Sequence, residues 1–75
     1  MDIEKIIAFE EGTLEDDEMF ELFQQLVDSG QAWTLQGFYG RMACRLIAAG
    51  HVKVSEGTVL PPRAAQYIEA VKGEA

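Results

Sequence analysis

The hydrophobic positions at the start of the chain recur three or four residues apart, which is the spacing of one face of an α-helix. Ile3, Ile6 and Ile7 have this spacing, and Gly12 follows as a residue suited to end a helix. The pattern therefore predicts a short amphipathic N-terminal helix within residues 1–12.

A second and wider apolar face follows over about residues 14–29 and predicts the next helix. Thr13 stands three residues before Asp16, an arrangement close to a capping box, so we expect Thr13 to cap the N-terminus of this helix. Gly30 is placed to end it. The residues that form the apolar face are Met19, Phe20, Leu22, Phe23, Leu26 and Val27.

A third helix is expected from Leu35 or Gly37 to Ala49, after a connector that contains Trp33. Gly37 and Gly40 weaken its first turns by roughly 1 kcal/mol each relative to alanine, so they require a reason. We expect them to let a neighbour approach closely, with Trp33 folding over the start of the helix. The inner face of this helix is predicted to hold Leu35, Phe38, Tyr39, Met42, Leu46 and Ile47.

The residues after Gly50, which is expected to end the third helix, alternate between apolar and polar side chains. The segments 51–54 and 58–60 have the period of a β-strand, and Ser55-Glu56-Gly57 lies between them as a turn with glycine at the position that needs a positive φ. This pattern predicts a two-stranded β-hairpin over residues 51–61.

Pro62 suits the first turn of a helix, and the apolar spacing after it predicts a final helix within residues 62–75. We therefore expect one small domain over residues 1–75, mostly α (α+β), with three to four helices and a C-terminal β-hairpin. This order of elements resembles winged-helix domains, with residues 13–50 as a helix-turn-helix-like core. The resemblance implies that the third helix is a recognition helix.

Charge divides the chain into two unequal parts. The formal net charge is −7, which excludes generic polyanion binding because a chain that holds phosphates needs a surplus of Lys and Arg. Residues 1–30 carry ten acids and one base, for −9, whereas residues 31–75 carry three acids and five bases, for +2.

Two interpretations of the acidic half stay open. The acids form a solvated face that complements the dipole of the second helix, or they form a docking surface for a basic site on another protein. The acids that would form that docking surface are Glu10, Glu11, Glu15, Asp16, Asp17, Glu18 and Glu21. Those predicted to make the docking contacts are the five of the second helix, Glu15, Asp16, Asp17, Glu18 and Glu21.

One face of the third helix is predicted to point outward, opposite its hydrophobic stripe, and to be small and basic. An alternative to the close approach of a neighbour is that the start of this helix holds a phosphate or a carboxylate with Gln36, Arg41 and Arg45. The residues assigned to the outward face are Gly37, Arg41, Cys44 or Arg45, and Ala48.

These features predict a small non-enzymatic module that binds and modulates a protein partner. The acids of the second helix and the Arg41/Arg45 face act as electrostatic docking contacts, with Phe38 or Tyr39 as an aromatic anchor. Because the two halves are oppositely charged, a homodimer in which they meet is a further interpretation. The alternative function is a winged-helix DNA-binding transcriptional regulator, in which Gln36, Arg41 and Arg45 reach base edges.

The sequence offers little for catalysis or for holding a cofactor or metal. Cys44 is the single cysteine, so no intrachain disulfide is expected, and we expect it to be a buried free thiol. His51 is the single histidine, and the acids lack the spacing of an EF-hand. We therefore expect no enzymatic activity, no cofactor and no metal.

No targeting segment is expected either. Residues 1–20 are acidic where a signal peptide is basic, and no apolar run approaches about 18 residues, so we expect neither a signal peptide nor a membrane span. With a single cysteine, the composition favours a cytoplasmic location.

The chain contains three distinctive stretches, residues 3–14 (IEKIIAFEEGTL), residues 23–30 (FQQLVDSG) and residues 35–41 (LQGFYGR). Together they resemble a family of small, uncharacterised proteins from tailed phages. In the last motif those proteins usually have serine where this chain has Phe38. The resemblance implies a phage-encoded accessory protein of the host cell cytoplasm, whose partner is a host or phage protein, and it implies no particular activity.

Overall fold

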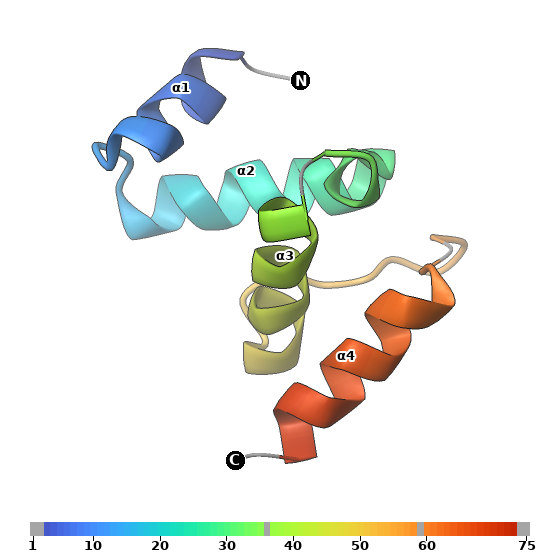
Figure 1. Ribbon diagram of the computed structural model, residues 1–75. Coiled ribbons are helices and arrows are strands. Elements are labelled where there is room, and N and C mark those ends of the chain that lie inside the picture. The colour runs from blue at the N-terminus through green and yellow to red at the C-terminus, as the bar shows by residue number, and fades with distance from the viewer. Residues whose placement is uncertain (1–2, 36, 59, 74–75) are drawn as a thin grey trace.

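The computed structural model describes residues 3–35, 37–58 and 60–73, which form helices joined by turns and loops (Figure 1). In chain order these ranges contain α1 (Ile3–Glu11), α2 (Asp16–Ser29), the 3₁₀ helix η1 (Gln31–Trp33), α3 (Gly37–Ala49) and α4 (Pro62–Gly73). The four helices predicted from apolar spacing are therefore confirmed.

Three of these helices end at glycines in the left-handed conformation. Gly12 follows α1 with a φ of +77°, and its N–H donates to the carbonyl of Phe9 at 3.1 Å, as predicted for the end of the first helix. Gly30 follows α2 with a φ of +80°, and Gly50 follows α3 with a φ of +86°. The N–H of Gly30 donates to the carbonyl of Val27 at 3.1 Å, and that of Gly50 donates to the carbonyl of Ile47 at 3.1 Å. Glycine adopts this conformation without a Cβ clash, so the predicted ends of all three helices are confirmed.

The main core forms where α2 crosses α3, and α1 covers one end of it (Figure 1). The ring of Phe9 on α1 meets the ring of Phe23 on α2 edge-on, with 5.3 Å between their centroids. The members of the core that are buried on α2 and α3 are Leu22, Phe23, Leu26, Val27, Tyr39, Ala43 and Leu46.

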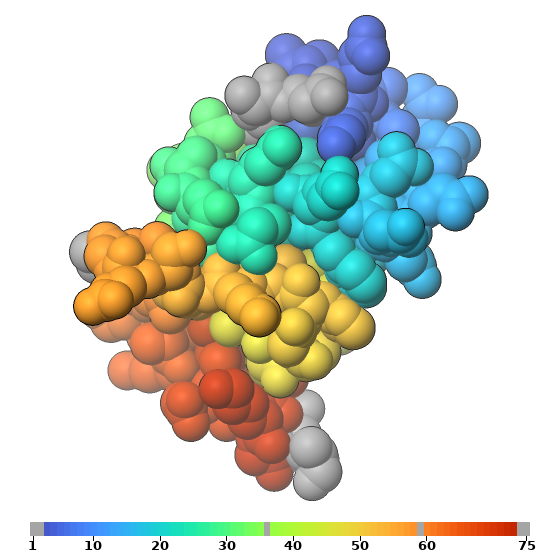
Figure 2. Space-filling model, turned by 180° about the vertical axis from the view of Figure 1, so that it is seen from behind, coloured from blue at the N-terminus to red at the C-terminus, as the bar shows by residue number. Residues whose placement is uncertain are grey.

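A second, smaller core lies between α3 and α4, which share the most extensive interface of the fold. Cys44 of α3 is buried there with Ala64 and Ile68 of α4. Figures 1 and 2 place α1 and α4 at opposite ends of the molecule, with α2 and α3 between them.

The β-hairpin predicted over residues 51–61 is wrong, and with it the α+β, winged-helix-like fold. The described part of this segment contains no strand, and it forms a loop that connects α3 with α4. Figure 2 shows the yellow and orange part of the loop between α2 and α4 on the rear face. Val59, which the prediction placed in the second strand, lies outside the described residues.

The physical reason is that other elements satisfy the backbone of the loop. The N–H groups of His51 and Val52 donate to the carbonyl of Leu46 at 2.9 and 3.2 Å, respectively. The Gln24 side chain on α2 accepts from the N–H of Lys53 and donates to its carbonyl. Because these backbone groups are already hydrogen-bonded, the segment needs no neighbouring strand. Its alternating pattern instead places the side chain of Val52 in the core.

Thr13 does not cap α2, so that prediction is also wrong. The residue before the helix is Glu15, in an extended conformation (φ −73°, ψ 160°) and without a capping bond from its side chain. The Thr13 hydroxyl instead donates to the carbonyl of Ala8 at 3.2 Å, as does the Thr13 N–H at 3.0 Å. Thr13 therefore completes the C-terminal end of α1 and does not cap α2.

Candidate functional site

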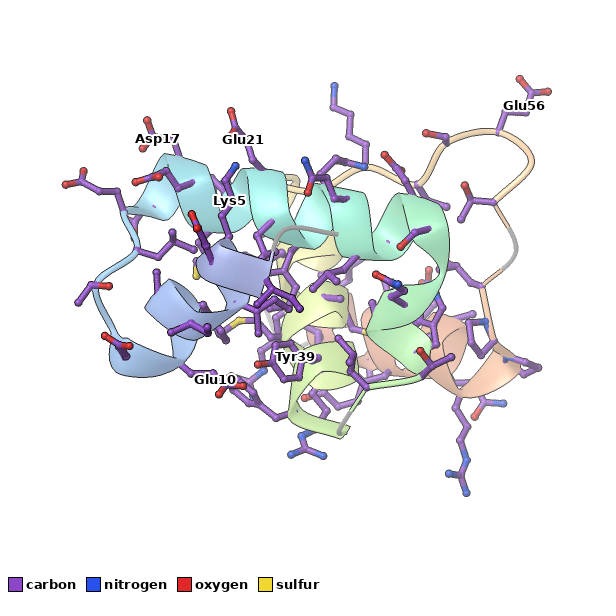
Figure 3. The ribbon with its side chains drawn as sticks, turned by 90° about the horizontal axis from the view of Figure 1, so that it is seen from above. Lys5, Glu10, Asp17, Glu21, Tyr39 and Glu56 are labelled. Atoms are coloured by element: carbon purple, nitrogen blue, oxygen red, sulfur yellow. The ribbon has the colours of Figure 1, made fainter. Side chains whose placement is uncertain are left out.

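The five acids predicted as docking contacts lie on the N-terminal half of α2 or directly before it, and all are exposed. We call this set, Glu15, Asp16, Asp17, Glu18 and Glu21, the acidic edge. Asp17 and Glu21 project from the same side of the molecule in Figure 3. Lys5 of α1 reaches Glu21 with 3.4 Å between Nζ and Oε2. Three of the acids stand in the first turn of α2, where the helix dipole also stabilises them.

Three further predicted contacts, Phe38, Arg41 and Arg45, lie on one side of α3 together with Met42. The prediction that Phe38 belongs to the inner face of this helix is wrong, because its side chain is exposed. Phe38, Arg41, Met42 and Arg45 line a shallow groove of about 220 Å³. Phe38 is 45% exposed. These four residues recur at helical spacing, so they form one continuous surface that we call the α3 strip.

The α3 strip is held in place from two directions. The ring of Phe38 stacks on the ring of Phe9 from α1, with 5.8 Å between their centroids. Arg45 donates from Nε to the hydroxyl of Tyr67 on α4, at 3.4 Å. Contacts with the helices before and after α3 thus orient an aromatic and a basic member of the strip.

Of the two aromatic residues predicted as anchors, only Phe38 is exposed. Tyr39 is 6% exposed, and its hydroxyl donates to Oε1 of Glu10 at 2.5 Å. Burial, together with the hydrogen bond to and the charge of Glu10, raises the pKa of Tyr39 to about 12. Figure 3 shows this pair on the opposite side of the molecule from Asp17 and Glu21. The remaining predicted contact, Gln36, lies outside the described residues.

The prediction that Cys44 and Ala48 point outward is wrong. Cys44 is 2% exposed, and both residues pack in the core that α3 shares with α4. Small side chains on this face allow α4 to approach, which buries Cys44 and partly buries Ala48, whereas Arg45 stays exposed. The predicted buried free thiol is confirmed.

The Cys44 thiol is poorly suited to nucleophilic chemistry. Its Sγ lies 3.7 Å from the carbonyl of Ala64, to which it donates, and burial raises the pKa of the thiol. A raised pKa leaves the unreactive protonated form in the majority at neutral pH. The described residues bring no three metal-ligating side chains together.

A larger cleft, of about 310 Å³, opens between η1, α3 and α4. Gly40 lies on its wall, and a Cβ added there would stand 3.8 Å from Cε3 of Trp33 and 3.5 Å from the carbonyl oxygen of Ala32. The expected close approach of Trp33 to the start of α3 is therefore confirmed. Arg63 and Tyr67 of α4 also line this cleft, and the sequence pattern did not identify either of them.

A family model described as a domain of unknown function (DUF7417) matches residues 2–72. The chain belongs to the DUF7417 family. Neither the curated proteins nor the solved structures contain a match to it. The family description names no activity. Among the described helices, none combines the length and apolar character needed to cross a membrane.

Proposed function

We propose that this domain is a small non-enzymatic accessory protein that binds and modulates a protein partner. The single observation that carries the proposal is the α3 strip, where the half-exposed ring of Phe38 lines one groove together with Arg41 and Arg45. Aromatic residues and arginine supply most of the binding energy at protein interfaces. An exposed aromatic side chain next to two arginines on one helix face is typical of such an anchor.

The α3 strip and the acidic edge are complementary to different kinds of surface on a partner. The α3 strip fits an apolar pocket with an acidic rim, because Phe38 and Met42 need burial and the arginines need carboxylates. The acidic edge adds long-range attraction toward a basic surface, and it raises the association rate more than the affinity. The resemblance of residues 35–41 to tailed-phage proteins supports a host or phage protein as this partner, in the cytoplasm of the host cell.

The oppositely charged surfaces also support self-association, in which the acidic edge of one copy meets the α3 strip of another. This arrangement uses the same residues as partner binding, so the dimer and the complex compete for one surface. Analytical ultracentrifugation over a range of salt concentrations separates the two cases. A dimer of this kind dissociates as salt rises, because screening weakens contacts between exposed charges.

The proposal is tested by affinity capture from a host lysate with Phe38→Ala and Arg41→Ala variants of the tagged domain. We expect each change to weaken capture of the partner by about tenfold or more, as is usual at the centre of an interface. Lys72→Ala, which removes an exposed positive charge at the far end of α4, is the matched control and should bind as the wild type does. Unchanged capture by both strip variants would refute the proposal.

Binding to duplex DNA is the result that would favour the alternative function, a DNA-binding regulator, over the proposed protein-binding module. The measurement is titration of a fluorescent duplex at about 150 mM salt, where few phosphate contacts give little affinity. The comparison is with an Arg41→Ala/Arg45→Ala variant. Binding that the double change abolishes favours the DNA-binding regulator over the protein-binding module.

A further inference from the structure

The cleft between η1, α3 and α4 has the size and lining of a binding site for a small molecule. Its volume of about 310 Å³ lies at the lower end of the range for ligand pockets, roughly 300–1,000 Å³. Figure 1 shows α3 and α4 diverging toward their N-terminal ends, which is where the cleft opens. Its apolar and aromatic wall is formed by Trp33, Leu35, Cys44, Pro61, Ala64 and Tyr67.

The charged residues that line the cleft are both basic. They are Arg41 of α3 and Arg63 in the first turn of α4, and no acid is among the lining residues. This is notable because the whole chain has 13 acids and only six basic residues. An anion in the cleft is therefore attracted from both walls, and no nearby carboxylate of the lining opposes it.

Two glycines keep this cleft open. Gly37 and Gly40 both line it, and neither has a positive φ, so the backbone does not require glycine at either position. A Cβ at Gly40 would make ordinary contacts, whereas one at Gly37 would come within 3.0 Å of Nη1 of Arg41. The Arg41 guanidinium thus folds back over the first turn of α3, in space that a side chain at position 37 would share. Glycines here weaken the helix and leave room beside a guanidinium at the cleft.

We propose that this cleft binds a small carboxylate that carries an aromatic or branched apolar group. A guanidinium recognises a planar carboxylate through paired N–H donors, and the apolar body then lies against Trp33 and Tyr67. Two sources have this chemistry: a free carboxylic acid, and the C-terminal residue of a polypeptide. This site differs from the α3 strip, although Arg41 lines both, and it does not depend on the proposed function.

The test uses 3-phenylpropionate as the probe and the fluorescence of Trp33, which is the only tryptophan in the chain. We expect saturable quenching or enhancement below about 10 mM probe, together with shifts of the Trp33, Gly40 and Ala64 amide signals in NMR spectra. The neutral control, 3-phenylpropan-1-ol, should bind about tenfold more weakly, because it lacks the charge that the arginines recognise. Equal binding of acid and alcohol, or no saturable signal with the acid, overturns the proposal.

Three variants locate the binding. Arg63→Gln alters an exposed side chain that belongs to the cleft alone, and it should weaken binding of the acid by about tenfold. Gly40→Leu places atoms in the cleft and should abolish binding, and its circular dichroism spectrum reports whether it still folds. Phe38→Ala belongs to the α3 strip and should leave binding unchanged. Full binding by Arg63→Gln contradicts the proposal even if Gly40→Leu proves too unstable to measure.

The source of the carboxylate is decided with a short peptide that ends in a free phenylalanine carboxylate and with its C-terminally amidated twin. Tighter binding of the free-acid peptide than of 3-phenylpropionate identifies a polypeptide C-terminus as the ligand. Tighter binding of 3-phenylpropionate identifies a free acid. In both cases the amidated peptide should bind about tenfold more weakly than the acid form, and equal binding of the twins counts against carboxylate recognition. Loss of this binding leaves partner capture through Phe38 unaffected, so the two proposals fail separately.

Discussion

The side-chain amide of Gln24 pairs with the backbone of Lys53 in the way that a neighbouring strand would. Nε2 of Gln24 donates to the carbonyl of Lys53 at 2.8 Å, and Oε1 accepts from its N–H at 2.9 Å. Nε2 also donates to Oδ1 of Asp28 at 3.0 Å, which fixes the orientation of the amide. One side chain on α2 thus anchors the loop between α3 and α4 and holds Val52 in the core.

Replacing Gln24 by alanine should destabilise the domain by about 1–2 kcal/mol, because two hydrogen bonds to the loop backbone are lost. Urea denaturation measures this change, and Gln25→Ala, at the exposed neighbouring position, is the matched control. Hydrogen exchange at the Lys53 amide should become faster in the Gln24 variant only. Equal stability of the two variants would show that the loop is held by the burial of Val52 alone.

The Tyr39–Glu10 pair should make stability fall at alkaline pH. The pKa of Tyr39 is raised from 10.0 to about 12 in the folded state, so the folded protein keeps a proton that the unfolded chain loses above pH 10. The stabilisation is complete below about pH 10 and is lost as pH rises toward 12, by roughly 2–3 kcal/mol in total. Urea titrations across this range measure it. A Tyr39→Phe variant should lose this part of the alkaline decrease, and an unchanged decrease would point to other groups.

Gly40 should accept alanine but not a larger side chain. A Cβ at this position meets Trp33 and Ala32 at ordinary contact distances, so Gly40→Ala gains helix propensity and should stabilise the domain by about 0.5–1 kcal/mol. Gly40→Leu should destabilise it, because the additional atoms have to displace Trp33. Thermal unfolding followed by circular dichroism tests both.

Replacing Gly50, a glycine with positive φ, by alanine should destabilise the domain, in contrast to Gly40→Ala. Gly50 has a φ of +86°, which alanine adopts only at a cost of roughly 1 kcal/mol. Gly50→Ala should therefore lower the melting temperature while Gly40→Ala raises it. Parallel shifts in both variants would show that helix propensity, and not backbone conformation, dominates at these sites.

Cys44 should react slowly with thiol reagents in the native state. The thiol is 2% exposed and its pKa is raised by burial, so both access and thiolate formation are limited. Alkylation by iodoacetamide, followed by mass spectrometry, should be slow in buffer and fast in urea above the unfolding midpoint. Similar rates in the two conditions would mean that α4 separates from α3 readily, since α4 covers this thiol.

The positions of the helices follow from local features of the sequence. Apolar residues three and four positions apart indicated all four helices, and Gly30, Gly50 and Pro62 marked boundaries that the fold uses. These signals depend on backbone conformation and on neighbours within one or two turns. They need no knowledge of what each helix packs against, so the sequence alone was sufficient for them.

The prediction of a hairpin failed because alternation of apolar and polar residues indicates only that a segment is extended with one side buried. The hydrogen-bond partner of the segment's backbone depends on the tertiary structure. At Lys53 the partner is the side chain of Gln24, which lies 29 positions earlier in the chain. The prediction for Thr13 failed for a similar reason, since its hydroxyl donates to the carbonyl of Ala8 at the end of α1 and does not accept from the N–H groups at the start of α2.

The features of the candidate site also divide into those that the sequence predicts and those that depend on the tertiary structure. The sequence by itself determined that Arg41 and Arg45 share a helix face and that the acids gather in the first half of the chain. Only the tertiary structure decided that Phe38 is exposed while Tyr39 is buried, because α1 brings Phe9 and Glu10 against them. It likewise decided that Cys44 faces inward and that Arg63 joins Arg41 at one cleft, because both depend on how α4 packs across the small residues of α3. Helical spacing determines which side chains share a face, but only packing against the other helices determines which face is covered.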